Sequence, residues 1–357
     1  MAVVGPQATA IGRLLDQSTY GPTPALMDHV AQVGITAFLD EQLVAPESPW
    51  PPFSAKITDV VDAFFANAVN GQDQLRQRII GALSEIFVIA RSKNNTSSSE
   101  IIPWLSLLSR NAFGNYRTLL REITLDASMG KYLDLVNSGA TGGAPNENYP
   151  RELMELFSLG VHVLNADGSP QVDGSGVPVP TYSQADVQNL ARGLSGWTYG
   201  SAAGLAPTKT GNQKYYPGPM IPFIGKHDTS PKTLLGHALP ANQTAEQDLD
   251  GALDIIFHHP NVGPFVATRL IRALVTSNPS ADYITRVAGV FNGSSGSPRG
   301  DMSAVIRAVL LDPEARDDDR QPTSAGSARR CSTRPRSAEP SASIRARSRS
   351  STRRSPR

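Results

Sequence analysis

Helix start and stop signals recur along this sequence and direct it toward a largely helical fold. The segment TPALMDHVAQVG places Thr23 as an N-cap, Pro24 at the first helical position and Gly34 at the stop. Capping boxes, in which two side chains three residues apart each bind the other's backbone, are expected to begin at Ser183 and Thr244. These three helices are marked by their ends as well as by their apolar spacing.

Further segments repeat apolar residues at spacings of three and four, which is the period of a helix with one buried face. They predict helices over 74–92, 115–136 with a break near Asp126, 149–159, 264–277 and 302–312. We expect around ten helices, and no repeat of about 20 to 50 residues suggests a solenoid. The predicted fold is mainly α, a single multi-helix domain over residues 1–316.

The exception is a loop-rich insertion over about 161–232. Two β-compatible fragments, VHVLN and VPVPTY, flank the turn-rich segment ADGSPQVDGSG. Turn residues between apolar runs are typical of a hairpin, and long loops often display functional groups. We therefore expect the insertion to contain a short β-hairpin.

Residues 317–357 differ in composition from the rest of the chain. Between 321 and 357 lie ten arginines, no lysine, one acid and the only cysteine, Cys331, so residues 1–320 carry a net charge of −8. An Arg/Ser-rich segment without apolar periodicity cannot bury enough surface to fold. We predict a disordered tail, and a helical domain without a cysteine for a disulfide, a nucleophile or a metal site.

Charge and hydropathy exclude two classes of partner. The acidic helical part has no basic patch of the kind that binds nucleic acid, so no nucleic-acid partner is predicted. No stretch reaches the roughly 18 apolar residues of a membrane span, so no transmembrane segment is predicted. The opening MAVVGPQATAIGRLLDQ also lacks the charged and apolar regions of a secretory signal.

The segment NENYPRELMELFSLG, residues 146–160, concentrates polar side chains on and before one short helix. Capping accounts for part of it, with Asn148 as the N-cap, Pro150 in the first turn and Gly160 as the stop. Capping does not account for the remaining charged residues, which are Glu147, Arg151, Glu152 and Glu155.

These four side chains are candidate site residues. In one interpretation they form a structural ion-pair network; in the other, the acids act as general acid and base or bind a metal, a sugar or a basic partner.

A second candidate group lies in the segment HDTSPKTLLG. His227 and Asp228 could bind a divalent metal together with Glu152 and Glu155, and Lys232 could hold an anion. The alternative is a turn begun by Asp228 and closed by local hydrogen bonds.

Several stretches in fixed order resemble the bacterial family called domain of unknown function 1800, over about residues 10–316. They are LLDQSTYGPTP, ITAFLDEQL, SRNAFGNYRTLLREITLDASMGKYLD, NENYPRELMELFSLG, YSQADVQNLARGLSGW, HDTSPKTLLG and HHPNVGPFVATRLIRALV. The resemblance implies a mostly helical domain in proteins that are commonly exported. It also implies a partner, because such genes often stand beside a member of the phosphatase-like domain of unknown function 1501 family.

The chain departs from the family pattern at both ends. The export signal that members often carry is missing here, and after AVLLDPEAR the expected helical sequence gives way to the Arg/Ser-rich tail. Our hypothesis is that the tail from about residue 320 is a frameshift product.

Two classes of function follow. In the first, the chain is an extracytoplasmic binding or assembly module that works with the phosphatase-like partner. In the second, it is a metal-dependent or hydrolase-like enzyme that joins Glu147, Glu152 and Glu155 to His227 and Asp228, with Arg192 as a further member and a divalent metal as its cofactor.

Overall fold

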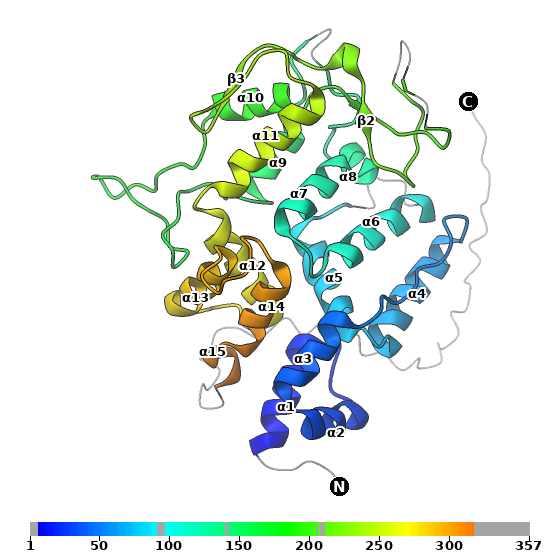
Figure 1. Cartoon of the computed structure of the whole chain (residues 1–357), viewed down its shortest axis with the longest axis vertical. Coiled ribbons are helices and arrows are strands. Elements are labelled where there is room, and N and C mark those ends of the chain that lie inside the picture. Colours follow the sequence, from blue (N-terminus) through cyan, green and yellow to red (C-terminus); the bar gives the residue numbers. More distant parts are fainter. Residues whose placement is uncertain (1–5, 91–96, 140–142, 205, 208–210, 318–357) are drawn as a thin grey trace, which may run out of the picture.

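A computed structural model describes residues 6–90, 97–139, 143–204, 206–207 and 211–317 of the chain (Figure 1). Within these ranges, helices α1 to α15 form the body, and the named β-strands make only two antiparallel two-stranded sheets. The prediction of a mainly α fold is confirmed.

The elements follow one another in three groups. The first group holds α1 (Pro6–Ser18), α2 (Pro24–Val33), α3 (Ile35–Val44), α4 (Ile57–Asn70), α5 (Gln74–Ile86), α6 (Ser98–Asn111), α7 (Tyr116–Leu125) and α8 (Ala127–Tyr132). The second holds α9 (Asn148–Glu155), α10 (Gln184–Gly193), β1 (Trp197–Thr198), β2 (Ile221–Pro222), the short 3₁₀-helix η1 (Ile224–Lys226), β3 (Lys232–Leu234), β4 (His237–Leu239) and α11 (Ala245–His258). The third holds α12 (Val262–Leu274), α13 (Ala281–Phe291), α14 (Met302–Leu311) and α15 (Pro313–Arg316).

The start signals read from the sequence are formed in the structure. The Thr23 hydroxyl accepts a hydrogen bond from the Leu26 backbone N–H at 3.2 Å, and Gly34 ends α2 with φ at 87°. Both capping boxes, at Ser183 and at Thr244, are complete. Local hydrogen bonding therefore sets these helix starts before tertiary packing is considered.

Some predicted boundaries were wrong. Helix α9 is shorter than the predicted 149–159, and the first backbone N–H group of the helix has a different hydrogen-bond acceptor from the one predicted. Asn148 is the first helical residue rather than the N-cap, and its N–H donates to the side chain of Asn146 at 2.8 Å. The predicted break in 115–136 is confirmed at Asp126, which ends α7 and caps α8 by accepting from the Met129 N–H at 2.8 Å.

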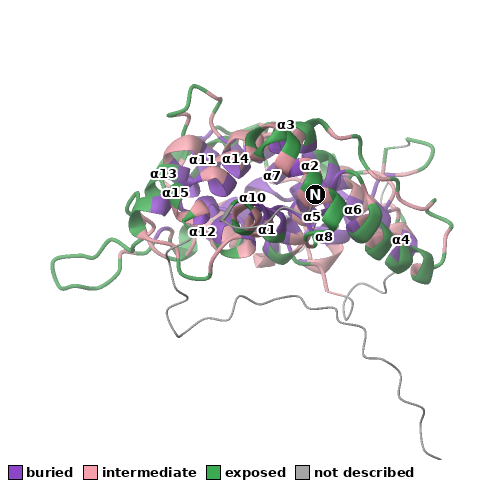
Figure 2. Ribbon diagram, turned by 90° about the horizontal axis from the view of Figure 1, so that it is seen from below, coloured by how far each residue is buried: buried purple, intermediate pink, exposed green. Residues whose placement is uncertain are grey.

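A contiguous cluster of buried apolar side chains connects the N-terminal helices with α9 to α15. Figure 2 shows the buried residues on the inward faces of the helices and the exposed residues on the outer faces and loops. Trp104 and Trp197 are both buried in this cluster.

The predicted hairpin is present, although it has little regular ladder. Residues 161–181 form isolated antiparallel bridges, such as His162 with Pro180, and a backbone bond from Val163 to Val179. Proline lacks the backbone N–H that a ladder needs, which limits the pairing at Pro170, Pro178 and Pro180. The segment projects from the side of the helical body (Figure 1).

The predicted tail lies outside the described residues from 318 onward, so the boundary at 316 stays a prediction. None of the helices described is both long and apolar enough to span a bilayer.

Candidate functional site

Two of the charged residues of α9 are tied to the start of α10. The Arg151 guanidinium lies 3.1 Å from Glu147 and donates to the Gln184 side-chain oxygen at 3.0 Å. Gln184 in turn donates to the Glu147 carboxylate at 2.7 Å. This closed triangle of polar contacts uses Arg151 to neutralise Glu147 and links the two helices.

Glu152 and Glu155, the two acids within α9, have no such cation among the described residues. The Glu155 carboxylate accepts a hydrogen bond from the Tyr182 hydroxyl at 2.9 Å. Partial burial, and then the neighbouring Glu155 charge, raise the pKa of Glu152 against the opposing influence of Arg151. Neither carboxylate makes an ion pair with a described cation within 4 Å. Glu152 and Glu155 thus form a partly exposed pair of like charges, the acid pair.

A groove opens beside the acid pair, with a volume of about 350 Å³. Its lining includes Tyr182, Asp186, Leu235 and His259. Burial, and then the hydrogen bond to Glu155, raise the pKa of Tyr182 to about 12. The tyrosine therefore contacts both the acid pair and the groove.

The second predicted group assembles around an acid from α11. The Lys232 Nζ lies 2.7 Å from Asp248 Oδ2, and the His227 Nε2 lies 3.1 Å from the same oxygen. The side chains of Lys232 and Asp248 are 0% exposed and that of His227 is 2% exposed. We call these three residues the buried triad.

Two polar atoms of the buried triad, one on His227 and one on Asp248, make no hydrogen bond to a described atom. His227 Nδ1 donates to the backbone oxygen of Ser195 at 2.9 Å, because a carbonyl can only accept. His227 Nε2 lies in ion-pair range of Asp248 but outside hydrogen-bond geometry, and Asp248 Oδ1 has no hydrogen-bond partner among the described atoms. Lys232 is fully engaged, since it also donates to the backbone oxygens of Asp228 and Ser230 at 2.6 and 2.8 Å.

Asp228 lies between the buried triad and α10, with its Oδ1 4.0 Å from the Lys232 Nζ. Arg192 donates to its carboxylate at 2.9 Å, and Ser230 donates to its other oxygen. Burial opposes ionisation, but the hydrogen bonds from Arg192 and Ser230 prevail and lower the pKa of Asp228 to about 2. The Ser230 backbone N–H donates to Asp228 Oδ1 at 2.9 Å, so the turn that Asp228 was predicted to begin is formed. The Asp228 backbone N–H donates to the Ser195 hydroxyl at 2.9 Å.

A glycine lets the loop carrying His227 approach β1. Gly196 has φ at +80°, and a Cβ there would lie 2.7 Å from the backbone nitrogen of His227. Any larger residue would have to displace the loop, because real Cβ atoms do not come this close.

The two groups lie toward opposite ends of α10. Gln184, at its start, contacts Glu147 and Arg151, and Arg192, near its end, contacts Asp228. Eight residues of helix separate these anchors by about 12 Å. No described contact joins the acid pair to the buried triad.

A metal centre would need several ligands in one place. Within the described ranges, no three His, Cys, Asp or Glu side chains group closely enough to hold a metal ion. The metal assignment of Glu152, Glu155, His227 and Asp228, and the catalytic roles considered for the candidates, stay predictions.

Asp248 was not among the site residues predicted from the sequence, although the apolar pattern of α11 indicates that it is buried. Buried residues of α11 recur at Ala245, Leu249, Ala252 and Ile256, and Asp248 falls in the same phase. An acid at an apolar position of an amphipathic helix predicts a buried charge that needs a partner.

Comparison with known proteins gives one positive result. Residues 13–330 match a family model whose description is "Protein of unknown function (DUF1800)". Neither the curated proteins nor the solved structures include a significant match.

Proposed function

Since the chain belongs to the DUF1800 family of proteins of unknown function, we propose that it works as an extracytoplasmic binding or assembly module that docks a partner protein through the acid pair and the adjoining groove. The supporting observation is the state of Glu152 and Glu155. They are like charges on one helix face, partly desolvated, and without a cation in ion-pair range.

Such a pair favours a cationic ligand. The repulsion that raises the pKa of Glu152 would be relieved by a lysine or arginine side chain from a partner. Tyr182 provides an aromatic wall at the adjoining groove, and aromatic residues are enriched in protein interfaces. Leu156 and Val161, which are 40% and 46% exposed, add apolar surface close in sequence to the acids.

The burial of the buried triad also favours a binding module over an enzyme. The three side chains of the buried triad are almost completely inaccessible to solvent, and Lys232 donates its hydrogen bonds to oxygens inside the protein. A catalytic centre needs access for substrate, whereas a structural ion network does not. These residues therefore support the body of the module in this proposal.

The partner we propose is a phosphatase-like protein of the domain of unknown function 1501 family, because the family resemblance implies that such chains are often encoded beside one. The test is to purify both proteins and to measure their association by biolayer interferometry at low and at moderate salt. We expect saturable binding, a slower association at higher salt, and about tenfold weaker binding for the double variant Glu152→Gln/Glu155→Gln.

The control is the double variant Asp16→Asn/Asp28→Asn, which removes the same charge from exposed positions on α1 and α2. It should bind like the parent chain. Failure of the parent chain to bind would refute this choice of partner, and equal weakening by both double variants would refute the docking face.

A further inference from the structure

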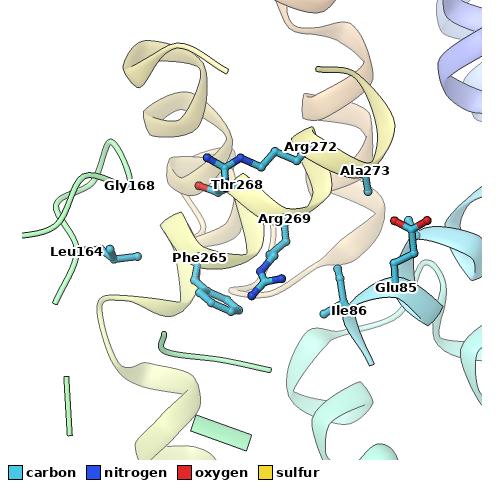
Figure 3. A pocket seen from close by; sticks show the side chains of 10 residues that line it. Glu85, Ile86, Leu164, Gly168, Phe265, Thr268, Arg269, Arg272 and Ala273 are labelled. Atoms are coloured by element: carbon cyan, nitrogen blue, oxygen red, sulfur yellow. The ribbon is translucent and has the colours of Figure 1, made fainter. Parts of the chain in front are cut away.

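A cavity lies between α12, α5 and the hairpin segment. Its volume is about 480 Å³, and its walls include Ile86, Leu164 and Phe265. Figure 3 shows α12 contributing Arg269 and Arg272 to this space, with Glu85 on α5. Neither the family nor the proposed docking face accounts for it.

The two arginines of this cavity have no carboxylate partner among the described residues. Neither Arg269 nor Arg272 makes a hydrogen bond or an ion pair with a described residue, whereas Arg117, Arg192 and Arg286 each bind an acid. The Arg269 guanidinium instead lies over the Phe265 ring, 5.0 Å from its centroid. The stacked guanidinium is held in place and keeps its N–H groups for another acceptor.

The charge of Arg269 reaches into the protein as well. It opposes the rise in the pKa of the buried Tyr116, so the guanidinium lies close enough to act on an interior phenol. Arg269 is half-buried, which strengthens its attraction for an anion compared with a fully hydrated arginine.

The hairpin segment closes one side of the cavity. Gly168, with φ at +78°, packs so closely that a Cβ there would lie 3.1 Å from the Thr268 hydroxyl and 3.2 Å from Ile284. Leu164 and Gly168 therefore bring an apolar edge against the same helix that carries the arginines (Figure 3). The cavity combines guanidinium groups with apolar walls.

We propose that this cavity binds a small organic anion, in which a carboxylate or phosphate group pairs with Arg269, the exposed Arg272 adds positive charge at the rim, and an apolar body lies against Phe265, Leu164 and Ile86. Planar guanidinium groups match these anions by paired N–H donors. Glu85 is the acid in the lining, and its negative charge repels ligands that carry several negative charges.

The experiment uses the full chain and three probes of similar size: phenyl phosphate, benzoate and benzyl alcohol. Binding is measured by isothermal titration calorimetry and by ligand-observed NMR. We expect saturable binding of at least one of the two anions, no saturable binding of the alcohol, and a preference between the anions that identifies the acid group.

Variants locate the site. Arg269→Gln should weaken anion binding about tenfold, Arg272→Gln by less, and Arg269→Lys should restore part of the loss because it keeps the charge without the fork geometry. Glu85→Gln should tighten binding about two- to threefold, because it removes a repelling charge. Unfolding midpoints of each variant establish that it is folded.

The matched control is Lys214→Gln, which removes one positive charge from an exposed position remote in sequence from the cavity. It should leave binding unchanged. The proposal is overturned if neither anion binds the folded parent chain in the millimolar range, or if Lys214→Gln weakens binding as much as Arg269→Gln does. These outcomes do not depend on the partner protein, so failure here and failure of the docking face can be told apart.

Discussion

Lys232 carries the charge balance of the buried triad. Its Nζ lies 2.7 Å from Asp248, and neither side chain is exposed to solvent. Lys232→Met should lower the free energy of unfolding by about 3–5 kcal/mol, because it leaves Asp248 as a buried charge with one cation fewer. Urea denaturation of the parent and the variant measures this difference.

The double variant Lys232→Met/Asp248→Leu is the control for that change. It removes both charges and should recover most of the lost stability, since a buried ion pair and an apolar pair of similar volume have comparable free energies. A loss below about 1 kcal/mol in the single variant would contradict the assignment of these contacts as an internal ion network.

Asp126 should make stability depend on pH. Burial raises the pKa of its carboxyl to about 7, against backbone hydrogen bonds from Met129 and Ser128, and the unfolded value is 3.8. The folded state therefore holds this proton more tightly. The resulting stabilisation is complete below pH 3.8 and is lost as the pH rises through about 7.

Asp126→Asn isolates this effect. Asparagine keeps an oxygen for the Met129 N–H but cannot ionise, so the variant should gain up to about 4 kcal/mol relative to the parent between about pH 4 and pH 8. The measurement is urea denaturation of both proteins across that range. A constant difference between them would show that this carboxyl does not titrate with the raised pKa.

For single residues, the sequence indicates which side chains group together better than it indicates how buried those side chains are. It identifies His227, Asp228 and Lys232 as a group, and the structure places all three around α10 and α11. It does not reveal that Lys232 is sealed from solvent, because burial depends on α11, which lies further along the chain. Asp248 supplies that missing partner.

Elements are predictable from sequence where their ends are fixed locally. The caps at Thr23, Ser183 and Thr244 form as expected, because each needs only atoms within three residues. The end of α9 at Glu155 was missed, since the following residues leave the helix while still burying Phe157 and Leu159 in the core. Tertiary packing decided that boundary.

The hairpin segment offers a test of how an element docks. Gly168 and Gly176 have nearly the same positive φ, at +78° and +80°, but only Gly168 touches α12 and α13, whereas a Cβ at Gly176 meets open space. Both Gly→Ala changes should cost about 1 kcal/mol for the backbone strain. Gly168→Ala should cost about 1–2 kcal/mol more, because the methyl group must displace Thr268 or Ile284.

Differential scanning calorimetry of the two alanine variants compares them directly. Gly176→Ala serves as the control for backbone strain, so the difference between the variants reports the packing of the hairpin on the helices. Equal destabilisation would mean that the segment does not hold this position in solution.

For the whole molecule, composition and periodicity suffice for the fold class but not for the site. Apolar spacing along 74–92 and 264–277 predicts helices that the structure contains as α5 and α12. The cavity that carries Arg269 and Arg272 forms only where these two helices and the hairpin segment meet. No local sequence pattern indicates that these arginines have no acidic partner among the described residues. Their state depends on which acids the fold brings near them.

The tail gives a prediction about the whole chain. Residues 318–357 contain eleven arginines and three acids, so a chain ending at Asp317 changes from a net charge of +1 to −7. An Arg/Ser-rich segment of this composition is not expected to bury surface against the helices. The shortened chain should therefore keep its free energy of unfolding within about 0.5 kcal/mol of the full chain while its isoelectric point falls. Urea denaturation and isoelectric focusing measure the two quantities, and a loss of more than about 2 kcal/mol would contradict the prediction that residues 318–357 do not contribute to stability.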